Sequence, residues 1–433
     1  MKRRATLRRT GARAKPNARL SLRSVPTVAI VVTLIFVAGL LCRLIVLTIP
    51  HREGDELIFG SLVQQLLAGR GYTLRGHPLL VSGWISAGNY DHALFFHPPG
   101  GIVLFLLLYS LFGKIGFALA QLLSYAVFFW SMMLLGWALL QPLTRLQLAV
   151  LATLAAFTPI MTHVVSRYWL DGPLLAFATA ATAVFVLGLR RDRRGLVVGA
   201  GVLLGWASLI KATAFLIVPG VAFVAFAMAP PGLRRRAMTY FLLFLALGAV
   251  IHVPWILWHW SAVGTPLPTW AGKPSAELLQ SNPYLRYVTL GLTPWTYVRQ
   301  LPQILWTLVP SVVVLCCCAR AGSSNRLALA LAGWIATVVS VHVVLGFLGY
   351  SKVLRYVILV TPAALLLFTL AVRELGTRLS SEPAGPRPAS RRWAFTGLLA
   401  VLAAAGLLLE VLQGIKTPLF DRADLIIPLL GSP

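Results

Sequence analysis

Long apolar runs follow one another along the chain, and they leave little room for charged residues. The first, Val25–Ile49, exceeds the roughly 20 apolar residues that cross a bilayer as a helix. Of the 433 residues, 58% are hydrophobic and 12% are charged, whereas soluble domains carry roughly 25% charged residues. Because backbone polar groups in lipid must be satisfied within their own segment, such runs fold as helices. The sequence therefore predicts an all-α polytopic membrane protein.

The apolar runs predict a bundle of about 13 transmembrane helices. Their ranges are 25–49, 100–112, 116–139, 144–158, 159–170, 174–189, 195–210, 212–229, 238–258, 301–319, 327–347, 357–372 and 393–412. Run 100–112 is expected to cross to the inner side, where Gly113-Lys114 makes a tight turn. Runs 144–158 and 159–170 are interpreted as a tight helical pair. Arg43, the only charge of the first run, is expected to snorkel to the outer interface.

The net charge of +26 is concentrated in short clusters between apolar runs, such as 190–194 and 234–236. This pattern is typical of cytoplasmic loops, so it argues against a nucleic-acid partner and favours contact with membrane lipids. We predict a multi-pass plasma (inner) membrane protein with a cytoplasmic N-terminus. The predicted parts are a basic cytoplasmic arm (1–24), a transmembrane core (25–372) with outer loops 50–99, 259–299 and 348–356, a cytoplasmic linker (373–392), and a last span with a short outer tail (393–433).

The first outer loop holds a rare group of acids. The loop opens with His51-Arg52-Glu53-Gly54-Asp55-Glu56 and closes with His97-Pro98-Pro99. From Glu56 onward, polar and apolar residues occupy opposite helical faces as far as Gly69. This pattern predicts an amphipathic helix that lies in the membrane interface. Asp55 would cap this helix if it had no chemical role.

Several short motifs occur in a fixed order along the chain. The acidic pair follows the first span, and His97-Pro98-Pro99 opens the next. The later motifs are Leu111-Phe112-Gly113, Arg167 before Asp171, Gly205-Trp206-Ala207, Leu209-Ile210-Lys211-Ala212-Thr213, and Lys352 with Arg355-Tyr356 and Pro362. Together they resemble the C-type membrane glycosyltransferases, in the branch of the protein O-mannosyltransferases and lipid A aminoarabinose transferases. The resemblance extends from about residue 25 to residue 372.

The resemblance implies a C-type bundle with its active site on the periplasmic or extracellular face. It implies inverting transfer of a hexose or pentose from a polyprenyl-phosphate carrier to a hydroxyl acceptor. The acceptor can be a glycan, a lipid or a protein. Such a reaction needs a base for the hydroxyl and cations for the leaving phosphate.

Three acidic residues are candidates for catalysis. Asp55 is the candidate general base, because the acid of the family's first loop falls here. Glu56 assists or orients the acceptor, unless it belongs to a solvated polar face. Asp171 stands among apolar residues, where an unexplained charge is costly, so we expect contact with the acceptor or the reacting centre. Pairing with Arg167, one helical turn earlier, is the structural alternative.

Four basic residues are candidates for the donor phosphate: Lys352, Arg355, Lys211 and His97. Interfacial snorkelling is the alternative for the lysines and the arginine. His97 could instead order its loop. No cofactor is predicted with certainty. A divalent metal held by His97, His252 and His259 is left open, although their spacing is not that of a metal motif.

Two other functional classes are weighed against glycosyl transfer. A transporter or lipid flippase would place its charges along a path through mid-membrane, often with an internal repeat. The sequence shows no internal repeat, and its candidate charges gather at one face. A non-catalytic scaffold would tolerate the loss of both Asp55 and Asp171.

Overall fold

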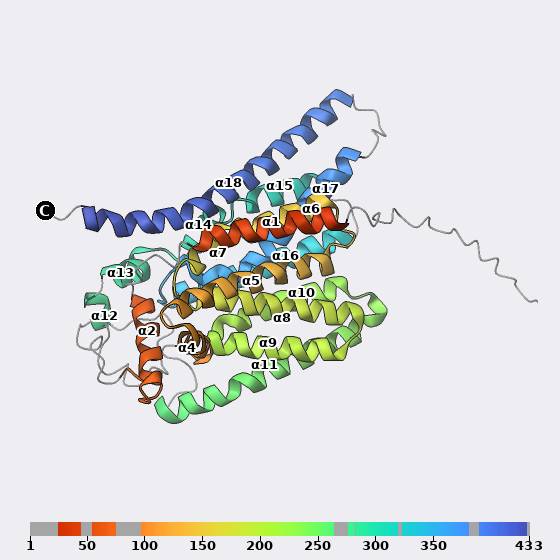
Figure 1. The fold of residues 1–433 in the computed structure, drawn as a ribbon. Helices are drawn as coiled ribbons and strands as arrows, with labels where there is room; N and C mark the ends of the chain where they lie inside the picture. Colours follow the sequence, from red (N-terminus) through yellow and green to blue (C-terminus); the bar gives the residue numbers. More distant parts are fainter. Residues whose placement is uncertain are drawn as a thin grey trace, which may run out of the picture.

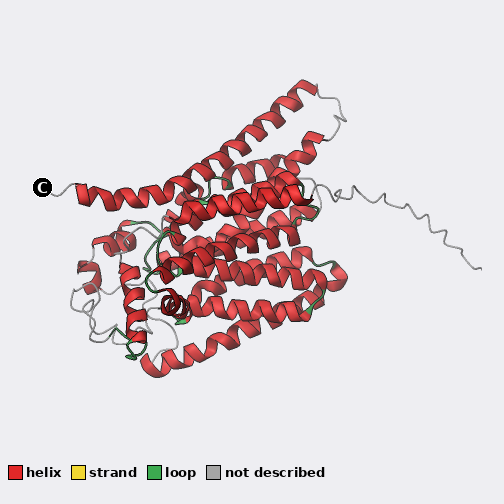
Figure 2. Cartoon of the chain, in the orientation of Figure 1, coloured by secondary structure: helices red, strands yellow, loops and turns green. Residues whose placement is uncertain are grey.

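The chain folds into helices alone wherever the structure, a computed structural model, describes it (Figure 2). The described residues are 25–44, 54–74, 97–263, 276–281, 283–318, 323–380 and 389–430. They contain no strand. The predicted all-α membrane fold is therefore confirmed.

Most of the long helices run side by side along one axis (Figure 1). These are α1 (Val25–Arg43), α5 (Ile115–Leu139), α6 (Arg145–Phe157), α8 (Asp171–Arg191), α9 (Arg194–Ile210), α10 (Val218–Met228), α11 (Arg234–Val263), α15 (Leu308–Cys318), α16 (Ser323–Phe347), α17 (Thr361–Ser380) and α18 (Ala389–Leu430). The remaining elements are α2 (Gly54–Leu67), α4 (Gly100–Phe112), α7 (Pro159–Val165), η5 (Ala212–Ile217), η6 (Pro231–Leu233), α12 (Ala276–Ser281), α13 (Pro283–Arg286), the π-helix η7 (Tyr287–Gly291), α14 (Thr296–Ile304) and η8 (Leu354–Val360).

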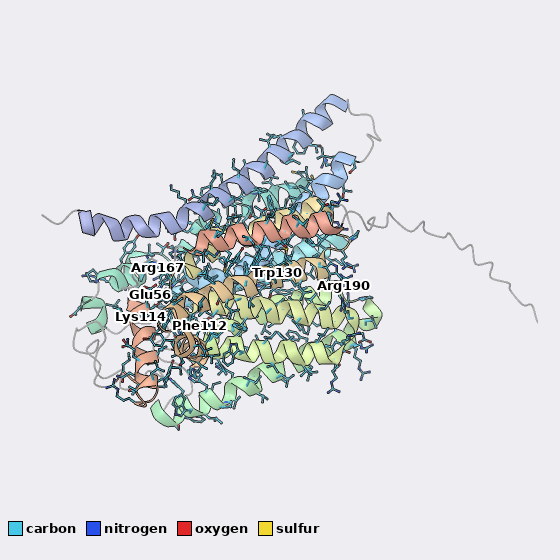
Figure 3. The ribbon with its side chains drawn as sticks, viewed as in Figure 1. Glu56, Phe112, Lys114, Trp130, Arg167 and Arg190 are labelled. Carbon is cyan, nitrogen blue, oxygen red and sulfur yellow. The ribbon has the colours of Figure 1, made fainter. Side chains whose placement is uncertain are left out.

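The two ends of this bundle differ in their charged residues (Figure 3). Glu56 and Arg167 lie at one end, which we call the site end. Arg190 lies at the other, which we call the basic end. Helix α2 lies across the site end, nearly perpendicular to the long helices (Figure 1).

Glycines bring α9 and α11 into close contact. A Cβ atom on Gly201 would lie 2.7 Å from Leu247, and one on Gly205 would lie 2.6 Å from Ile251. From the other side, a Cβ atom on Gly248 would lie 2.7 Å from Leu204. Small residues at membrane helix interfaces let backbones approach closely and gain dispersion contacts. The spacing of these glycines thus fixes the position of α9, which ends at the candidate site.

The predicted number of 13 spans is not confirmed. Among the described residues, seven helices are long and apolar enough to cross a membrane, or eight if the bent pair α14 and α15 forms one span. Four shorter apolar helices lie in segments 27–43, 100–112, 194–210 and 212–228. The runs predicted as a tight pair, 144–158 and 159–170, instead contribute one apolar stretch, Arg145–Val165.

Helix α4 does not carry the chain to the basic end. Figure 1 shows α4 nearly end-on, across the direction of its neighbours, and Figure 3 shows Phe112 and Lys114 at the same end of the bundle as Glu56. The predicted inner turn at Gly113-Lys114 is therefore wrong, because 13 apolar residues were counted as a span. The sequence analysis thus counted one membrane crossing too many at α4 and one too many at α6 and α7. Because the two extra crossings cancel, Asp171 still falls at the same end as Glu56.

Two local predictions also need correction. Arg43 does not snorkel: it is 1% exposed, donates to the Thr162 hydroxyl at 3.0 Å, and lies 4.1 Å from the centre of the Tyr125 ring. Helix α2 has the predicted extent, but Glu56 and Gln65 of its polar face are buried. The helix packs on the bundle with parts of both faces.

Candidate active site

Four segments that are distant in sequence meet at the site end. Asp55 lies in the first turn of α2, and Asp171 in the first turn of α8. Lys211 follows the last residue of α9, where an extended backbone conformation separates α9 from η5. Arg355 belongs to η8. The sequence predicted all four as site residues, and the structure brings them together.

Arg355 connects the two aspartates. Its Nη2 atom is ion-paired with Asp55 Oδ2, and its Nε atom lies 3.8 Å from Asp171 Oδ2. The guanidinium also lies 4.1 Å from the centre of the Trp169 ring. A planar guanidinium suits this position, because it can bond at its edge while its face rests on an aromatic ring.

Asp171 is enclosed by two cations. Besides Arg355, it accepts a hydrogen bond from Lys211 Nζ at 2.8 Å, and its side chain is 4% exposed. Asp171 therefore pairs with these cations rather than with Arg167, the partner considered from sequence. Asp55 differs in its accessibility, because its side chain is 24% exposed. Of the two carboxylates, Asp55 is the one that a substrate can reach.

The segment between α7 and α8 supplies contacts that the sequence analysis missed. The Tyr168 backbone N–H donates to Glu56 Oε1 at 2.9 Å. Gln121 Nε2 donates to the Trp169 backbone carbonyl at 2.8 Å and so fixes the backbone of the residue whose ring contacts Arg355. Glu56 is thus buried against protein and does not form a solvated polar face. The aromatic pair Tyr168-Trp169 just before Asp171 was the sequence feature that could have indicated these contacts.

A second aromatic residue lies between the two cations. The Tyr356 ring centre is 5.0 Å from Lys211 Nζ and 6.0 Å from the Arg355 guanidinium carbon. Aromatic faces stabilise nearby cations when water is excluded. Tyr356 therefore helps to hold positive charge at a site where the two carboxylates and two cations balance.

His97 lies within electrostatic reach of this cluster. Burial lowers the pKa of His97 well below its ordinary value. Lys211 lowers this pKa further, Asp171 opposes the shift, and Arg355 adds to it. The imidazole is therefore neutral near pH 7. Any contact with a phosphate is a hydrogen bond rather than an ion pair.

Lys352 is held elsewhere in the described structure. Its Nζ atom donates to the Thr289 carbonyl, and its backbone N–H donates to the Val288 carbonyl at 2.8 Å. The neighbouring Ser351 hydroxyl lies 2.8 Å from the Thr289 hydroxyl. Lys352 thus anchors the loop before η8 to η7. Within the described part of the chain, its ammonium forms no ion pair with either aspartate.

The histidines considered for a metal lie among aromatic rings. Ring centres of His252 and His259 are each 5.2 Å from that of Trp255 on α11. Phe215 packs against His252 at 5.4 Å. In the segments that the structure describes, no group of three or more His, Cys, Asp or Glu residues could hold a metal ion.

The chain is similar to known proteins in sequence and in fold. Residues 96–258 match the sequence model of the dolichyl-phosphate-mannose-protein mannosyltransferases. No curated protein sequence matches the chain. The fold resembles the crystal structure of ArnT from Cupriavidus metallidurans bound to undecaprenyl phosphate. That comparison has a TM-score of 0.54 and 19% identity, and covers 92% of this chain and 75% of that one.

Two structures of the Archaeoglobus fulgidus oligosaccharyltransferase have a similar fold. One is tethered to an acceptor peptide that contains the NVT sequon. It has a TM-score of 0.53 and 14% identity, with 89% of this chain and 55% of that chain covered. The apo form has a TM-score of 0.52 and 13% identity, with 89% and 56% covered. The chain thus spans little more than half of that enzyme. As the sequence predicted, the chain resembles the C-type membrane glycosyltransferases in both its matched segment and its fold.

Proposed function

We propose that this protein transfers a sugar from a polyprenyl-phosphate carrier to a hydroxyl acceptor. The family match and the fold support the general class of reaction. The observation that carries the proposal is the position of Arg355, which connects an accessible carboxylate with an enclosed one. An anionic donor headgroup that enters this site meets both Arg355 and Lys211.

The donor phosphate competes with Asp55 for the Arg355 guanidinium. Charge-assisted bonds from arginine to phosphate resemble those to carboxylate in strength and geometry. When the guanidinium turns to the phosphate, Asp55 Oδ2 becomes open to the acceptor hydroxyl. Asp171 keeps Lys211 and Arg355 in place during this exchange.

The reaction is then a single displacement. Asp55 accepts the proton of the acceptor hydroxyl, and the hydroxyl oxygen bonds to the anomeric carbon. The bond between that carbon and the phosphate oxygen breaks, and polyprenyl phosphate leaves with the electron pair. Arg355 and Lys211 stabilise the negative charge that develops on the leaving oxygen. With no enzyme nucleophile, the anomeric configuration inverts.

The remaining candidates have supporting roles. Glu56 fixes α2 to the Tyr168 backbone and so positions Asp55. Neutral His97 hydrogen-bonds to the donor headgroup. Lys352 orders the loop that carries Arg355 and comes within reach of the phosphate only if that loop moves. The site end faces the periplasm or the exterior, and the transferred group is a hexose or a pentose.

Release of polyprenyl phosphate by the purified protein tests this function. Donors that carry mannose, glucose and aminoarabinose are offered to the wild type, Asp55→Asn and Glu374→Gln. Glu374 is the matched carboxylate control because it follows Arg373, which bonds to the Leu140 carbonyl just after α5, away from the site. We expect release by the wild type and Glu374→Gln and loss in Asp55→Asn. Full release by Asp55→Asn would refute the assigned base, and no release from any of the three donors in the presence of a hydroxyl acceptor would refute transfer of these sugars.

A further inference from the structure

A cavity of about 490 Å³ lies at the basic end of the bundle. Its lining comes from the ends of α5, α8 and α10, the starts of α11 and α16, and from α17. Arg190, one of its lining residues, marks the end of the molecule opposite Glu56 (Figure 3). Its size falls within the range of about 300–1,000 Å³ that is usual for ligand sites. The cavity is thus separate from the Arg355 site.

The lining carries an excess of positive charge. Arg190, Arg236 and Arg373 contribute three cations, and Asp192 is the single acid among the lining residues. Asp192 is already ion-paired with Arg236 and accepts a hydrogen bond from the Tyr240 hydroxyl at 2.8 Å. That pair is neutral as a whole. Arg190 and Arg373 therefore leave the cavity with two positive charges.

Backbone carbonyls hold both of these arginines in place. Arg190 donates to the Ala138 carbonyl and, at 3.3 Å, to Gln141 Oε1. Arg373 donates to the Leu140 carbonyl at 3.4 Å. Since a guanidinium has five N–H donors, these bonds leave each arginine able to bind a ligand. Two fixed guanidiniums beside one cavity suit a phosphate group.

Apolar side chains complete the cavity wall, among them Met228, Leu233, Leu327 and Leu370. A free phosphate ion would gain nothing from these groups, whereas a lipid could place the start of an acyl chain against them. Basic pockets between transmembrane helices are known to hold anionic lipid headgroups. We propose that this cavity binds the phosphate headgroup of an anionic phospholipid, with the guanidiniums of Arg190 and Arg373 on the phosphate.

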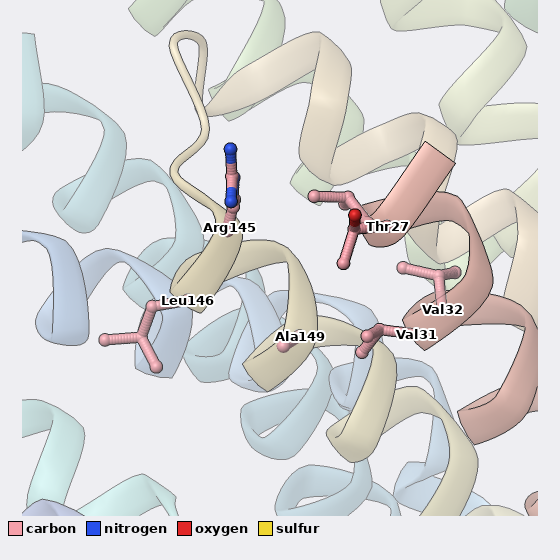
Figure 4. A pocket seen from close by; sticks show the side chains of 7 residues that line it. Thr27, Val31, Val32, Arg145, Leu146 and Ala149 are labelled. Atoms are coloured by element: carbon pink, nitrogen blue, oxygen red, sulfur yellow. The ribbon is translucent and has the colours of Figure 1, made fainter. Parts of the chain in front are cut away.

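A second hollow shows the contrast. Figure 4 shows the groove between α1 and α6, which has a volume of about 270 Å³. Its lining is apolar except for Thr27 and Arg145. It therefore lacks the paired guanidiniums that select an anionic headgroup.

Thermal unfolding of the full-length protein in detergent tests the lipid site. Phosphatidylglycerol is titrated against phosphatidylcholine with the same acyl chains, and glycerol 3-phosphate is the probe without chains. The test variant is Arg190→Gln/Arg373→Gln, and the control with the same charge loss is Arg191→Gln/Arg194→Gln. Arg191 stacks over the Trp137 ring at 5.3 Å, and neither control residue lines the cavity.

We expect phosphatidylglycerol to raise the Tm of the wild type and the control well above the effect of phosphatidylcholine. In the test variant, the apparent affinity for phosphatidylglycerol should fall about tenfold or more, as the loss of charge-assisted bonds implies. Equal effects of the two lipids, an unchanged response of the test variant, or the full effect from glycerol 3-phosphate would each overturn the proposal.

A variant with every arginine intact covers the case in which Arg190→Gln/Arg373→Gln does not fold. Ala229 is a buried residue of the lining, and Ala229→Phe would fill part of the cavity from its apolar side. The Tm rise with phosphatidylglycerol should shrink in this variant. An undiminished rise would place the lipid elsewhere on the surface and overturn the assigned cavity.

Discussion

Arg355 is the residue on which the electrostatics of the site depend, because among the described residues it is the one that contacts both aspartates and the Trp169 ring. Arg355→Lys keeps the charge but replaces the planar fork with a compact ammonium. One bond to a charged group contributes about 1.5–3 kcal/mol. We therefore expect kcat/KM for the donor to fall about 10- to 100-fold, measured as release of polyprenyl phosphate.

Arg299→Lys is the matched control for that change. Arg299 is an exposed residue of α14 whose described hydrogen bond goes to the Thr293 hydroxyl at 3.4 Å. Its replacement should leave kcat/KM unchanged. If Arg355→Lys behaved like Arg299→Lys, the connection between the aspartates would have no part in donor binding.

His97 makes a prediction about pH. Burial keeps its pKa in the folded protein well below the ordinary value, so below about pH 6.5 the unfolded chain binds a proton that the folded chain does not. Stability is therefore lost as the pH falls below about 6.5. His97→Gln should show a smaller drop in Tm than the wild type between pH 8 and pH 5.5. Equal drops would mean that His97 is protonated in the folded state.

At the scale of helices, one buried carboxylate binds both the interruption between α6 and α7 and the interruption between α14 and α15. Glu410 of α18 is fully buried, accepts from the Thr158 hydroxyl at 2.7 Å, and accepts from the Thr307 backbone N–H at 3.2 Å. Thr158 separates α6 from α7, and Thr307 lies at the 87° bend between α14 and α15. Glu410 thus satisfies donors that the interrupted helices expose.

Glu410→Ala would leave two buried donors without this acceptor. Each such loss costs about 1–3 kcal/mol, so we expect the free energy of unfolding to fall by about 2–6 kcal/mol, seen as a lower Tm in detergent. Glu410→Gln keeps an acceptor and should retain most of the stability. Leu409→Ala, on the exposed side of the same helix, is the control for lost side-chain volume. An unchanged Tm in Glu410→Ala would show that the two breaks are held by other contacts.

These elements show what the sequence could and could not predict. Apolar runs and the order of motifs were enough for the helical class and for Asp55, Asp171, Lys211 and Arg355. They could not show that α4 lies across the bundle, because a crossing helix and a short transverse helix have the same composition. They also misplaced Arg43, whose partner Thr162 is 119 residues away. Partners at such distances are set by packing, which one sequence does not display.

At the scale of the whole molecule, the two ends of the bundle differ in the balance of their charged groups. Acidic and basic groups meet in balanced pairs at the site end, where Arg355 holds two carboxylates. Unbalanced arginines gather at the basic end, a pattern that is typical of cytoplasmic loops. We therefore propose that the donor enters from the outer side while anionic lipids hold the opposite face.

The position of Lys114 tests this arrangement. The sequence predicted that Lys114 lies on the inner side, whereas Figure 3 shows it at the site end of the bundle. Single cysteines at Lys114, Arg299 and Arg194, all exposed residues, are introduced after the four native cysteines are replaced by serine. A membrane-impermeant maleimide is then applied to intact cells and to permeabilised cells.

Lys114→Cys and Arg299→Cys should react in intact cells. Arg299 lies at the site end, because Tyr297 of the same helix α14 donates to the carbonyl of Ser351, the neighbour of Lys352. Arg194→Cys, at the start of α9 in the basic cluster, should react only after permeabilisation. If Lys114→Cys reacted together with Arg194→Cys, α4 would cross the membrane after all. The two counting errors would then no longer cancel, and Asp55 and Asp171 would have to lie on opposite faces. Their shared ion pairs with Arg355 could not exist in that arrangement. This labelling pattern would therefore contradict both the arrangement of the helices and the site.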